Sequence, residues 1–246
     1  MTPITKLILL ALVLVLAHTV ETVLGFGCTL IAMALGIYLF PLHVILPVLV
    51  VLGLLQSIWL VGRWFRHIQW RVLLFRILPS TALGMAVGIH YRTQVADYKQ
   101  LIILLGIFIM AASVMEVVLI YKTRAVGSSL PWYLAIPILI VGGIFHGIFA
   151  TGGPMIIYYA GRELKEPAEF RATVSTLWLV LNSALAVNLY SIGQLNLETL
   201  TMTGMVLPGF ILGIVLGSRV KFRAIVFKVL IYMLLFFAGL ILLFQP

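Results

Sequence analysis

The chain has 246 residues, of which 63% are hydrophobic and only 9% are charged. Because a soluble globular domain carries about 25% charged residues, this composition indicates a polytopic membrane protein whose solvent is mostly lipid. Sixteen Lys and Arg residues exceed seven Asp and Glu residues, but they lie in short connections between apolar blocks, as the positive-inside rule expects. Nucleic-acid binding is therefore not expected, and the single cysteine, Cys28, cannot form an intrachain disulfide.

Eight apolar blocks follow one another along the chain. They run at 5–40, 43–62, 71–90, 100–121, 131–160, 171–191, 197–218 and 225–244. The beginning of the first block resembles a signal peptide, but no small-residue cleavage site follows, so we retain it as mature structure. Six blocks are close to the length of about 20 residues that crosses a hydrocarbon core of about 30 Å.

The first and fifth blocks are too long for one crossing. A straight helix over 5–40 would reach about 54 Å, and each long block contains a glycine-bearing break near its centre, "GFGCT" at 25–29 and "TGGP" at 151–154. Each block is therefore either a full span followed by a short extra helix, or a hairpin that enters and leaves the membrane by the same face. Hairpins place all basic residues except Lys6, Arg92 and Lys99 on one side, so the charge distribution favours hairpins.

The two halves of the chain resemble each other. An offset of 125 residues places Glu21 on His146 and Gly27 on Gly152, and an offset of 129 places "PSTALGMAVG" at 79–88 on "PGFILGIVLG" at 208–217. The first four blocks and the last four each comprise one hairpin and three crossings, an odd number, so the halves must have opposite orientations. We therefore predict two inverted repeats, 1–124 and 125–246, a plan of many secondary transporters. The doubled glycine pattern also has a simpler interpretation, close helix packing.

The breaks indicate an anion-binding function. Backbone groups that leave helical geometry at membrane depth cost several kcal/mol each unless protein or water satisfies them. In TGGP, Thr151 or Gly153 suits a helix cap and Pro154 suits the first helical turn, so free amides face the hairpin tip, where the helix dipole is positive. We expect the sister tip to repeat this geometry from the other side of the membrane, and the two tips to meet at mid-depth around a small oxyanion. The alternative is a pair of kinks sealed by packing.

The breaks, the later "LNSAL" at 181–185, the repeated halves and the total length together resemble the TauE/SafE family of membrane transporters, also called the sulfite exporter or TSUP family. The resemblance covers essentially the whole chain, although GFGCT lacks the fuller glycine cluster and the proline often seen in the family's first half. It implies transport of sulfur-containing anions, such as sulfite, sulfonates or related organic acids, across the cytoplasmic membrane without ATP.

Polar residues in the spans complete the predicted site. The predicted substrate-binding residues are Gly25, Phe26, Gly27, Cys28, Thr29, Gln56, Ser57, Thr151, Gly152, Gly153, Pro154, Asn182 and Ser183. Ionisable groups in a bilayer are costly and are functional candidates by default, so we expect Glu21, His146 and His18 to serve proton coupling, with structural pairing as the alternative. The mid-span amides and hydroxyls have their own alternative, interhelical hydrogen bonding.

No metal or cofactor is expected from the sequence. His18 and Glu21 have a spacing compatible with metal binding, but no third ligand follows a recognisable pattern, and Cys28 is interpreted as a small packing residue. HExxH, GxSxG and GxxxxGK[ST] are all absent from the sequence, so we do not expect an enzyme. The predicted function is a secondary transporter of a small anion in the inner membrane, with lipid and substrate as partners. A passive anion channel with the same pore-lining tips is the alternative.

Overall fold

Helices are the only regular secondary structure in the described part of the chain. The computed structural model describes residues 2–24, 27–95, 97–122, 130–219 and 224–244, and these ranges contain no strand. Seven helices among them are long and apolar enough to cross a membrane. The predicted all-α, polytopic membrane fold is therefore confirmed.

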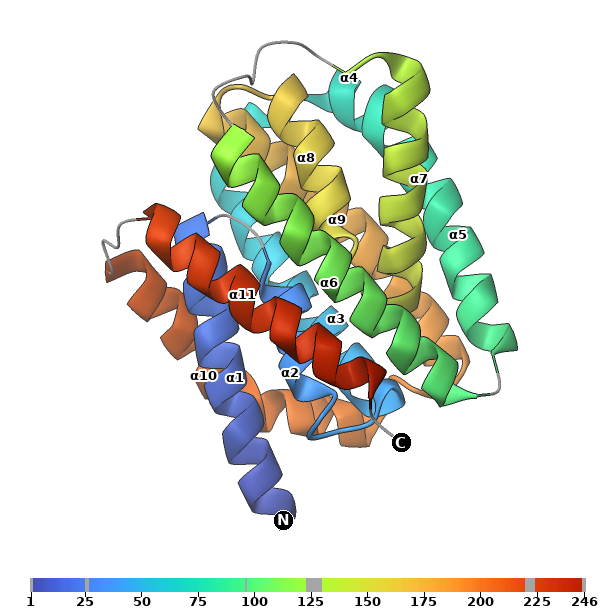
Figure 1. Ribbon diagram of the computed structural model, residues 1–246, viewed down its shortest axis with the longest axis vertical. Coiled ribbons are helices and arrows are strands. Elements are labelled where there is room, and N and C mark those ends of the chain that lie inside the picture. The colour runs from blue at the N-terminus through green and yellow to red at the C-terminus, as the bar shows by residue number, and fades with distance from the viewer. Residues whose placement is uncertain (1, 25–26, 96, 123–129, 220–223, 245–246) are drawn as a thin grey trace. The chain divides into compact units, whose positions relative to one another are not determined.

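The helices follow the predicted blocks closely. In chain order they are α1 (Pro3–Leu24), α2 (Cys28–Gly36), α3 (Leu42–Trp64), α4 (Trp70–Val72), α5 (Leu78–Gln94), α6 (Tyr98–Lys122), α7 (Trp132–Phe149), α8 (Gly153–Glu163), α9 (Pro167–Ser191), α10 (Leu197–Arg219) and α11 (Ala224–Leu243) (Figure 1). A short 3-10 turn (Phe65–His67) follows α3, and a π-helical segment (Leu73–Ile77) joins α4 to α5. The block predicted at 71–90 is thus helical throughout but not a single regular α-helix.

Both long blocks break where the glycines predicted a break, and the chain turns back on itself at each one. The end of α2 returns to α1, where a Cβ added at Gly36 would lie 3.6 Å from the side chain of Leu10. In the same way, Gly142 of α7 lies against Ile156 of α8. Each break is therefore a bend between two helices that lie against each other. The longer helices, α1 and α7, are each long and apolar enough to cross a membrane, and a hairpin that enters and leaves by the same face stays a prediction.

The helices group into two compact units, each of which draws segments from both halves of the chain. Unit 1 comprises 1–45, 94–126 and 204–246, and unit 2 comprises 46–93 and 127–203. The α1–α2 bend belongs to unit 1, and the α7–α8 bend belongs to unit 2. The convergence of the two tips stays a prediction, as does the division of the chain into repeats at residue 124.

Unit 1 is built around close approaches between helices at glycines. Along α6 and α11, which lie side by side in Figure 1, a Cβ at either Gly106 or Gly239 would lie 2.8 Å from the carbonyl oxygen of the other glycine. On α10, a Cβ at Gly213 would lie 2.8 Å from the carbonyl oxygen of Val15 on α1. Small residues allow such backbone contact, which is a main source of helix association in lipid.

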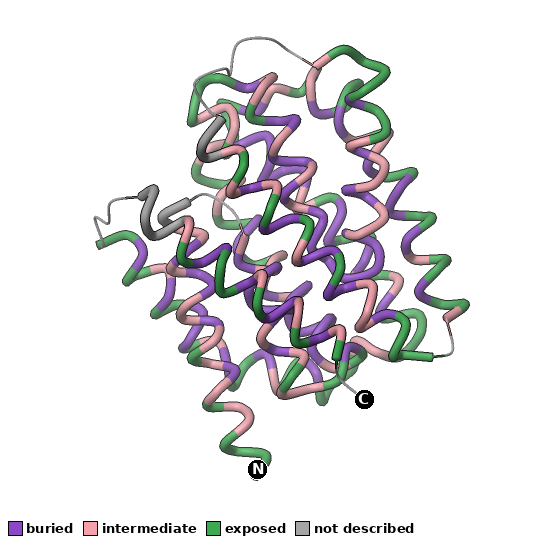
Figure 2. The backbone as a smooth tube through the Cα atoms, viewed as in Figure 1, coloured by how far each residue is buried: buried purple, intermediate pink, exposed green. Residues whose placement is uncertain are grey.

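In unit 2, glycines allow the same close backbone approach between α5 and α7. A Cβ at Gly84 would overlap the carbonyl oxygen of Ile140, and a Cβ at Gly143 would overlap that of Thr81. Figure 2 shows buried and exposed residues alternating along α5, with one face packed on protein and the other directed outward. The outward face carries apolar side chains, among them Leu83 and Val87, as expected for a helix that borders lipid.

The contacts of α10 with α1 and of α5 with α7 share one register. Equivalent residues stand 129 apart on α5 and α10 and 125 apart on α1 and α7. The contact of Gly84 with Ile140 is equivalent to that of Gly213 with Val15, and the contact of Gly88 with Ile144 is equivalent to that of Gly217 with Thr19. In the same way, the contact of Gly143 with Thr81 is equivalent to that of His18 with Phe210. These recurring contacts support an internal repeat, and the opposite orientation of the halves stays a prediction.

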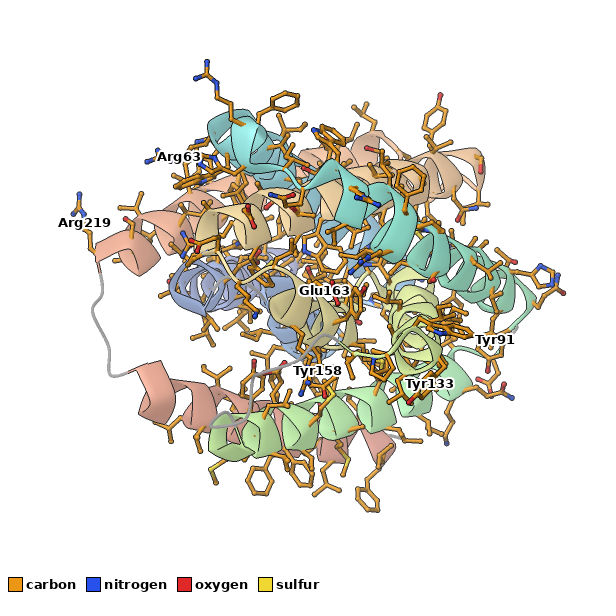
Figure 3. The ribbon with its side chains drawn as sticks, turned by 90° about the horizontal axis from the view of Figure 1, so that it is seen from above. Arg63, Tyr91, Tyr133, Tyr158, Glu163 and Arg219 are labelled. Atoms are coloured by element: carbon orange, nitrogen blue, oxygen red, sulfur yellow. The ribbon has the colours of Figure 1, made fainter. Side chains whose placement is uncertain are left out.

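One end of unit 2 carries polar ties between segments that are distant in sequence. Arg76 of the π-helical segment pairs with Glu163 at the end of α8, which Figure 3 labels together with Tyr158 of the same helix. The backbone N–H of Gln69 donates to the hydroxyl of Thr173 on α9 at 2.9 Å. Arg76 therefore has a specific carboxylate partner.

Candidate functional site

The α7–α8 bend begins at an unusual backbone conformation. Ala150 has φ 56°, in the left-handed region that non-glycine residues rarely adopt, and its N–H donates to the carbonyl oxygen of His146 at 2.7 Å. This is the left-handed ending of many helices, for which glycine is the usual residue. The bend is therefore held in place by its surroundings at the cost of local backbone strain.

Gly152 fixes the bend against α7. A Cβ at this position would overlap the carbonyl oxygen of Gly142, and it would also lie 2.9 Å from the Cβ of His146. Only glycine allows this backbone approach. At Gly153, by contrast, the nearest side-chain atom would be 3.9 Å from an added Cβ. Packing against α7 therefore requires glycine at position 152 but not at position 153.

The bend presents hydrogen-bond donors that have no protein acceptor among the described residues. The N–H groups in the first turn of a helix have no partner within that helix. No side chain in the described ranges caps α8. The amides of Gly153 and Met155 donate to no backbone carbonyl of the described residues. The Thr151 hydroxyl, on a residue only 2% exposed, also lacks a hydrogen-bond partner among these residues. The expected capping by Thr151 or Gly153 is therefore wrong, because Gly152 occupies the cap position and has no side chain to donate or accept.

His146 lies directly beside this group of donors. His146 is 2% exposed, and its ring stacks on that of Trp178 with centroids 5.2 Å apart and an interplanar angle of 20°. The Asn182 side chain faces the imidazole, yet neither ring nitrogen makes a hydrogen bond of ordinary geometry within the described part of the chain. A buried imidazole in this state can accept or donate to a ligand.

Asn182 is positioned by close packing between α9 and α3. A Cβ added at Gly53 would lie only 2.9 Å from the side-chain nitrogen of Asn182. The glycine therefore leaves the space that this amide occupies. Gln56 and Ser57 are buried on the same helix as Gly53. Ser183, in contrast, lies on the exposed side of α9, because adjacent residues of a helix face different directions.

The α1–α2 bend offers a different set of groups. Gly27 has φ +102°, and a Cβ there would meet no atom within 4 Å, so glycine is required by the backbone conformation and not by crowding. Cys28 begins α2 and is buried, and its sulfur lies 3.6 Å from the hydroxyl oxygen of Thr29. The predicted site residues Gly25 and Phe26 lie outside the described residues.

The proton-coupling candidates Glu21 and His18 both lie near the end of α1. The Glu21 carboxylate is within hydrogen-bonding range of the backbone N–H and the thiol of Cys28, and the His18 ring packs edge to face on Phe210, with centroids 4.6 Å apart. Both residues therefore belong to unit 1, whereas His146 belongs to unit 2.

Sequence reasoning missed two residues that shape the α7–α8 site. Trp178 supports the His146 ring, and Ala150 carries the left-handed bend. A signal for Trp178 was present, since it stands four residues before Asn182 and so shares its helix face. No sequence signal marks Ala150, because alanine gives no indication of a left-handed conformation.

A family model described as "Sulfite exporter TauE/SafE" matches residues 10–242, which include both bends and the recurring glycine contacts. The chain belongs to the TauE/SafE family. Two curated relatives are similar to this TauE/SafE protein. One, from Comamonas testosteroni, is named "Probable inner membrane transporter protein TsaS" and is 31% identical over 160 residues, 63% of either chain. The other, from Cupriavidus necator, is named "Probable sulfite/organosulfonate exporter TauE" and is 24% identical over 204 residues, 81% of this chain and 78% of that protein.

The match thus spans less than two thirds of the TsaS relative's length, and no solved structure matches the chain. Family membership together with the seven helices able to cross a membrane identifies a multi-pass inner membrane protein of a transporter family. The predicted localisation and the predicted family are confirmed.

Proposed function

We propose that this TauE/SafE protein is a secondary transporter of a small sulfur-containing anion: sulfite, a sulfonate, or a related organosulfur compound or organic acid. Family membership and the names of both relatives support a membrane transporter or exporter of this class. The observation that carries the proposal is a set of donors at the α7–α8 bend, among them the buried Thr151 hydroxyl, that have no protein acceptor among the described residues.

These donors suit an oxyanion better than a cation or an apolar solute. Two first-turn amides at the positive end of the α8 dipole and the Thr151 hydroxyl can each donate to an anionic oxygen. Hydrogen bonds to a charged group contribute about 1.5 to 3 kcal/mol each, so three of them offset a large part of the cost of removing an anion from water. His146 and Asn182 provide further polar atoms beside them.

The second bend supplies the remaining part of the proposal. By the internal repeat, Gly27, Cys28 and Thr29 correspond to the residues of the α7–α8 bend, and we propose that the transported anion also uses the amides of this helix start. Gln56 and Ser57 are proposed to add hydrogen bonds along the path. Alternating access, the common mechanism of transporters with inverted repeats, would expose the anion to each side in turn.

Proton coupling is the proposed energy source. Glu21, His18 and His146 are titratable groups inside membrane-spanning segments, where an ionisable residue is a functional candidate by default. A proton carried in the same direction as the anion reduces the net charge that must cross the lipid. A passive channel lined by the same residues is the competing function, and it would need no titratable group.

Uptake into sealed proteoliposomes distinguishes the carrier from the channel. With radiolabelled sulfite outside and an imposed pH gradient, a coupled carrier accumulates the label above its external concentration, and a protonophore abolishes the accumulation. A channel only equilibrates the label, and that result would contradict the proposal. The matched variants are Thr151→Val, expected to lower uptake by about tenfold or more through loss of one charged hydrogen bond, and Thr176→Val, a control whose buried hydroxyl already donates within α9.

A further inference from the structure

Unit 1 contains a cluster of three side chains with metal-binding atoms. A nitrogen of His18, a carboxylate oxygen of Glu21 and the sulfur of Cys28 all lie within 4.8 Å of one another. His18 is 2% exposed and Cys28 is 7% exposed. The sequence offered only the first two residues, at a spacing of three along α1, and the hairpin bend brings Cys28 to them as the third.

The fold explains why these three residues meet. His18 and Glu21 share one face near the end of α1, and the bend returns the first residue of α2 to that face. The Glu21 carboxylate lies close to the backbone N–H and the thiol of Cys28. The His18 ring is oriented by its edge-to-face contact with Phe210 of α10.

From this geometry we propose that His18, Glu21 and Cys28 bind a divalent metal ion of the zinc class. Imidazole nitrogen, carboxylate oxygen and thiolate sulfur are the three ligand types that Zn²⁺ takes in proteins, at about 2.0 to 2.3 Å. In a tetrahedral site these bond lengths put ligand atoms about 3.3 to 3.8 Å apart, so side-chain adjustments of about 1 Å close the present cluster on the ion. Three protein ligands leave a fourth position for water or an anion.

Charge balance favours the ion at this depth. A neutral imidazole, a carboxylate and a thiolate carry two negative charges, which a divalent cation neutralises, so the loaded site places no net charge in the apolar interior. Mg²⁺ and Ca²⁺ prefer oxygen ligands and do not suit a site with sulfur and nitrogen. Binding displaces whatever protons the thiol and the carboxyl hold, so affinity falls as the pH is lowered.

This site goes beyond the proposed transport function but shares Glu21 and His18 with it. A bound ion occupies the groups that we propose to carry the coupling proton, so zinc-class metals are expected to inhibit proton-driven uptake competitively with protons. The binding test below requires no transport, so the failure of either proposal can be told apart from the failure of the other.

Cobalt absorption on the purified full-length protein, stripped of metal and of any affinity tag, provides the direct test. Co²⁺ substitutes for Zn²⁺, and a thiolate ligand adds a sulfur-to-cobalt charge-transfer band. Because the chain has one cysteine, that band can arise only from Cys28. We expect the band, with intense tetrahedral d–d transitions, to saturate at one Co²⁺ per chain and to be removed by added Zn²⁺.

Near-isosteric variants separate this site from surface binding and from a purely structural cluster. Cys28→Ser should abolish the charge-transfer band, and Glu21→Gln and His18→Gln should each weaken Co²⁺ binding by at least about tenfold, since even outer partners of metal ligands contribute tenfold to a hundredfold. His67→Gln, at an exposed histidine, should leave the titration unchanged. A monodisperse wild-type protein that shows no charge-transfer band at saturating Co²⁺, or a band unaffected by both Glu21→Gln and His18→Gln, would overturn the proposal.

Discussion

At the scale of single residues, the candidate site depends on two adjacent glycines with different surroundings. An added Cβ at Gly152 would overlap the backbone of α7, whereas one at Gly153 would meet only a flexible isoleucine end at 3.9 Å. The donors that we propose to bind the anion are the groups on either side of Gly152. The position of the bend and the function of the site are therefore coupled through this residue.

Gly152→Ala should destabilise the protein by about 1 to 3 kcal/mol, the usual cost of overpacking, and should abolish anion uptake because the bend must move away from α7. Thermal unfolding in detergent and proteoliposome uptake measure the two effects. Gly153→Ala is the matched control, expected to retain the stability of the wild-type protein. Equal behaviour of the two variants would show that the approach of Gly152 to Gly142 is not needed.

The proton-coupling residues lead to a prediction about pH. A group that carries the coupling proton sets the pH range over which the uptake rate changes, so its replacement should flatten that dependence. Glu21→Gln and His146→Ala are each expected to do so, as measured by initial uptake rates across pH at constant anion concentration. Unchanged profiles in both variants would rule out a coupling role for either residue.

Residue-scale features differ in how far the sequence could predict them. Thr151, Gly152 and His146 could be singled out because polar and glycine residues are conspicuous in an apolar block. The approach of Cys28 to His18 and Glu21 could not, because it depends on the direction in which the chain leaves the bend. The same holds for Trp178, whose contact with His146 joins two helices that the sequence does not show to be neighbours.

At the scale of helices, glycine contacts hold each hairpin to its neighbour. α5 packs on α7 through Gly84, Gly88, Gly143 and Gly147, each of which would place a Cβ in overlap with a backbone oxygen of the facing helix. Contacts of this kind let two helices approach closely enough for dispersion attraction to hold them together in lipid. The simpler interpretation of the doubled glycine pattern, helix packing, is therefore confirmed for α5.

Gly84→Ala tests this packing because the substitution is otherwise favourable in a helix. Alanine is preferred to glycine by about 0.8 to 1.0 kcal/mol in a helix interior, so any loss of stability must come from crowding against Ile140. We expect a lower midpoint of thermal unfolding for Gly84→Ala. Gly62→Ala in α3, where an added Cβ would meet nothing within 4 Å, is expected to be neutral or stabilising, and a stable Gly84→Ala protein would contradict the packing described for α5 and α7.

The helices themselves could be predicted almost completely. Apolar length and the Gly and Pro residues at 25–29 and 151–154 located every long helix and both bends, because the cost of unpaired backbone groups in lipid leaves few alternatives. The π-helical segment (Leu73–Ile77) could not be predicted, since its five residues have the same apolar character as the flanking turns. Its identity depends on hydrogen-bond register, which apolar character does not specify.

At the scale of the whole molecule, the sequence halves and the compact units are different divisions of one chain. α10, from the second half, packs on α1, and α5, from the first half, packs on α7. The sequence offsets identify equivalent helices but do not reveal which helices share a unit, because contact between distant segments is decided by side-chain fit. The recurring register of the two helix pairs is nevertheless what an internal repeat predicts.

Anion binding at the α7–α8 bend can be measured by the thermal stability of the purified protein titrated with sulfite, sulfate, thiosulfate, sulfonates and carboxylates. A ligand that binds only the folded state stabilises it by about 2.7 kcal/mol at one hundred times its dissociation constant. If the donors at the α7–α8 bend bind the anion, at least one sulfur oxyanion will raise the unfolding midpoint of the wild-type protein and of Thr176→Val, and the increase will be much smaller in Thr151→Val. An unfolding midpoint that no sulfur anion raises, or one raised equally in Thr151→Val, would contradict the account.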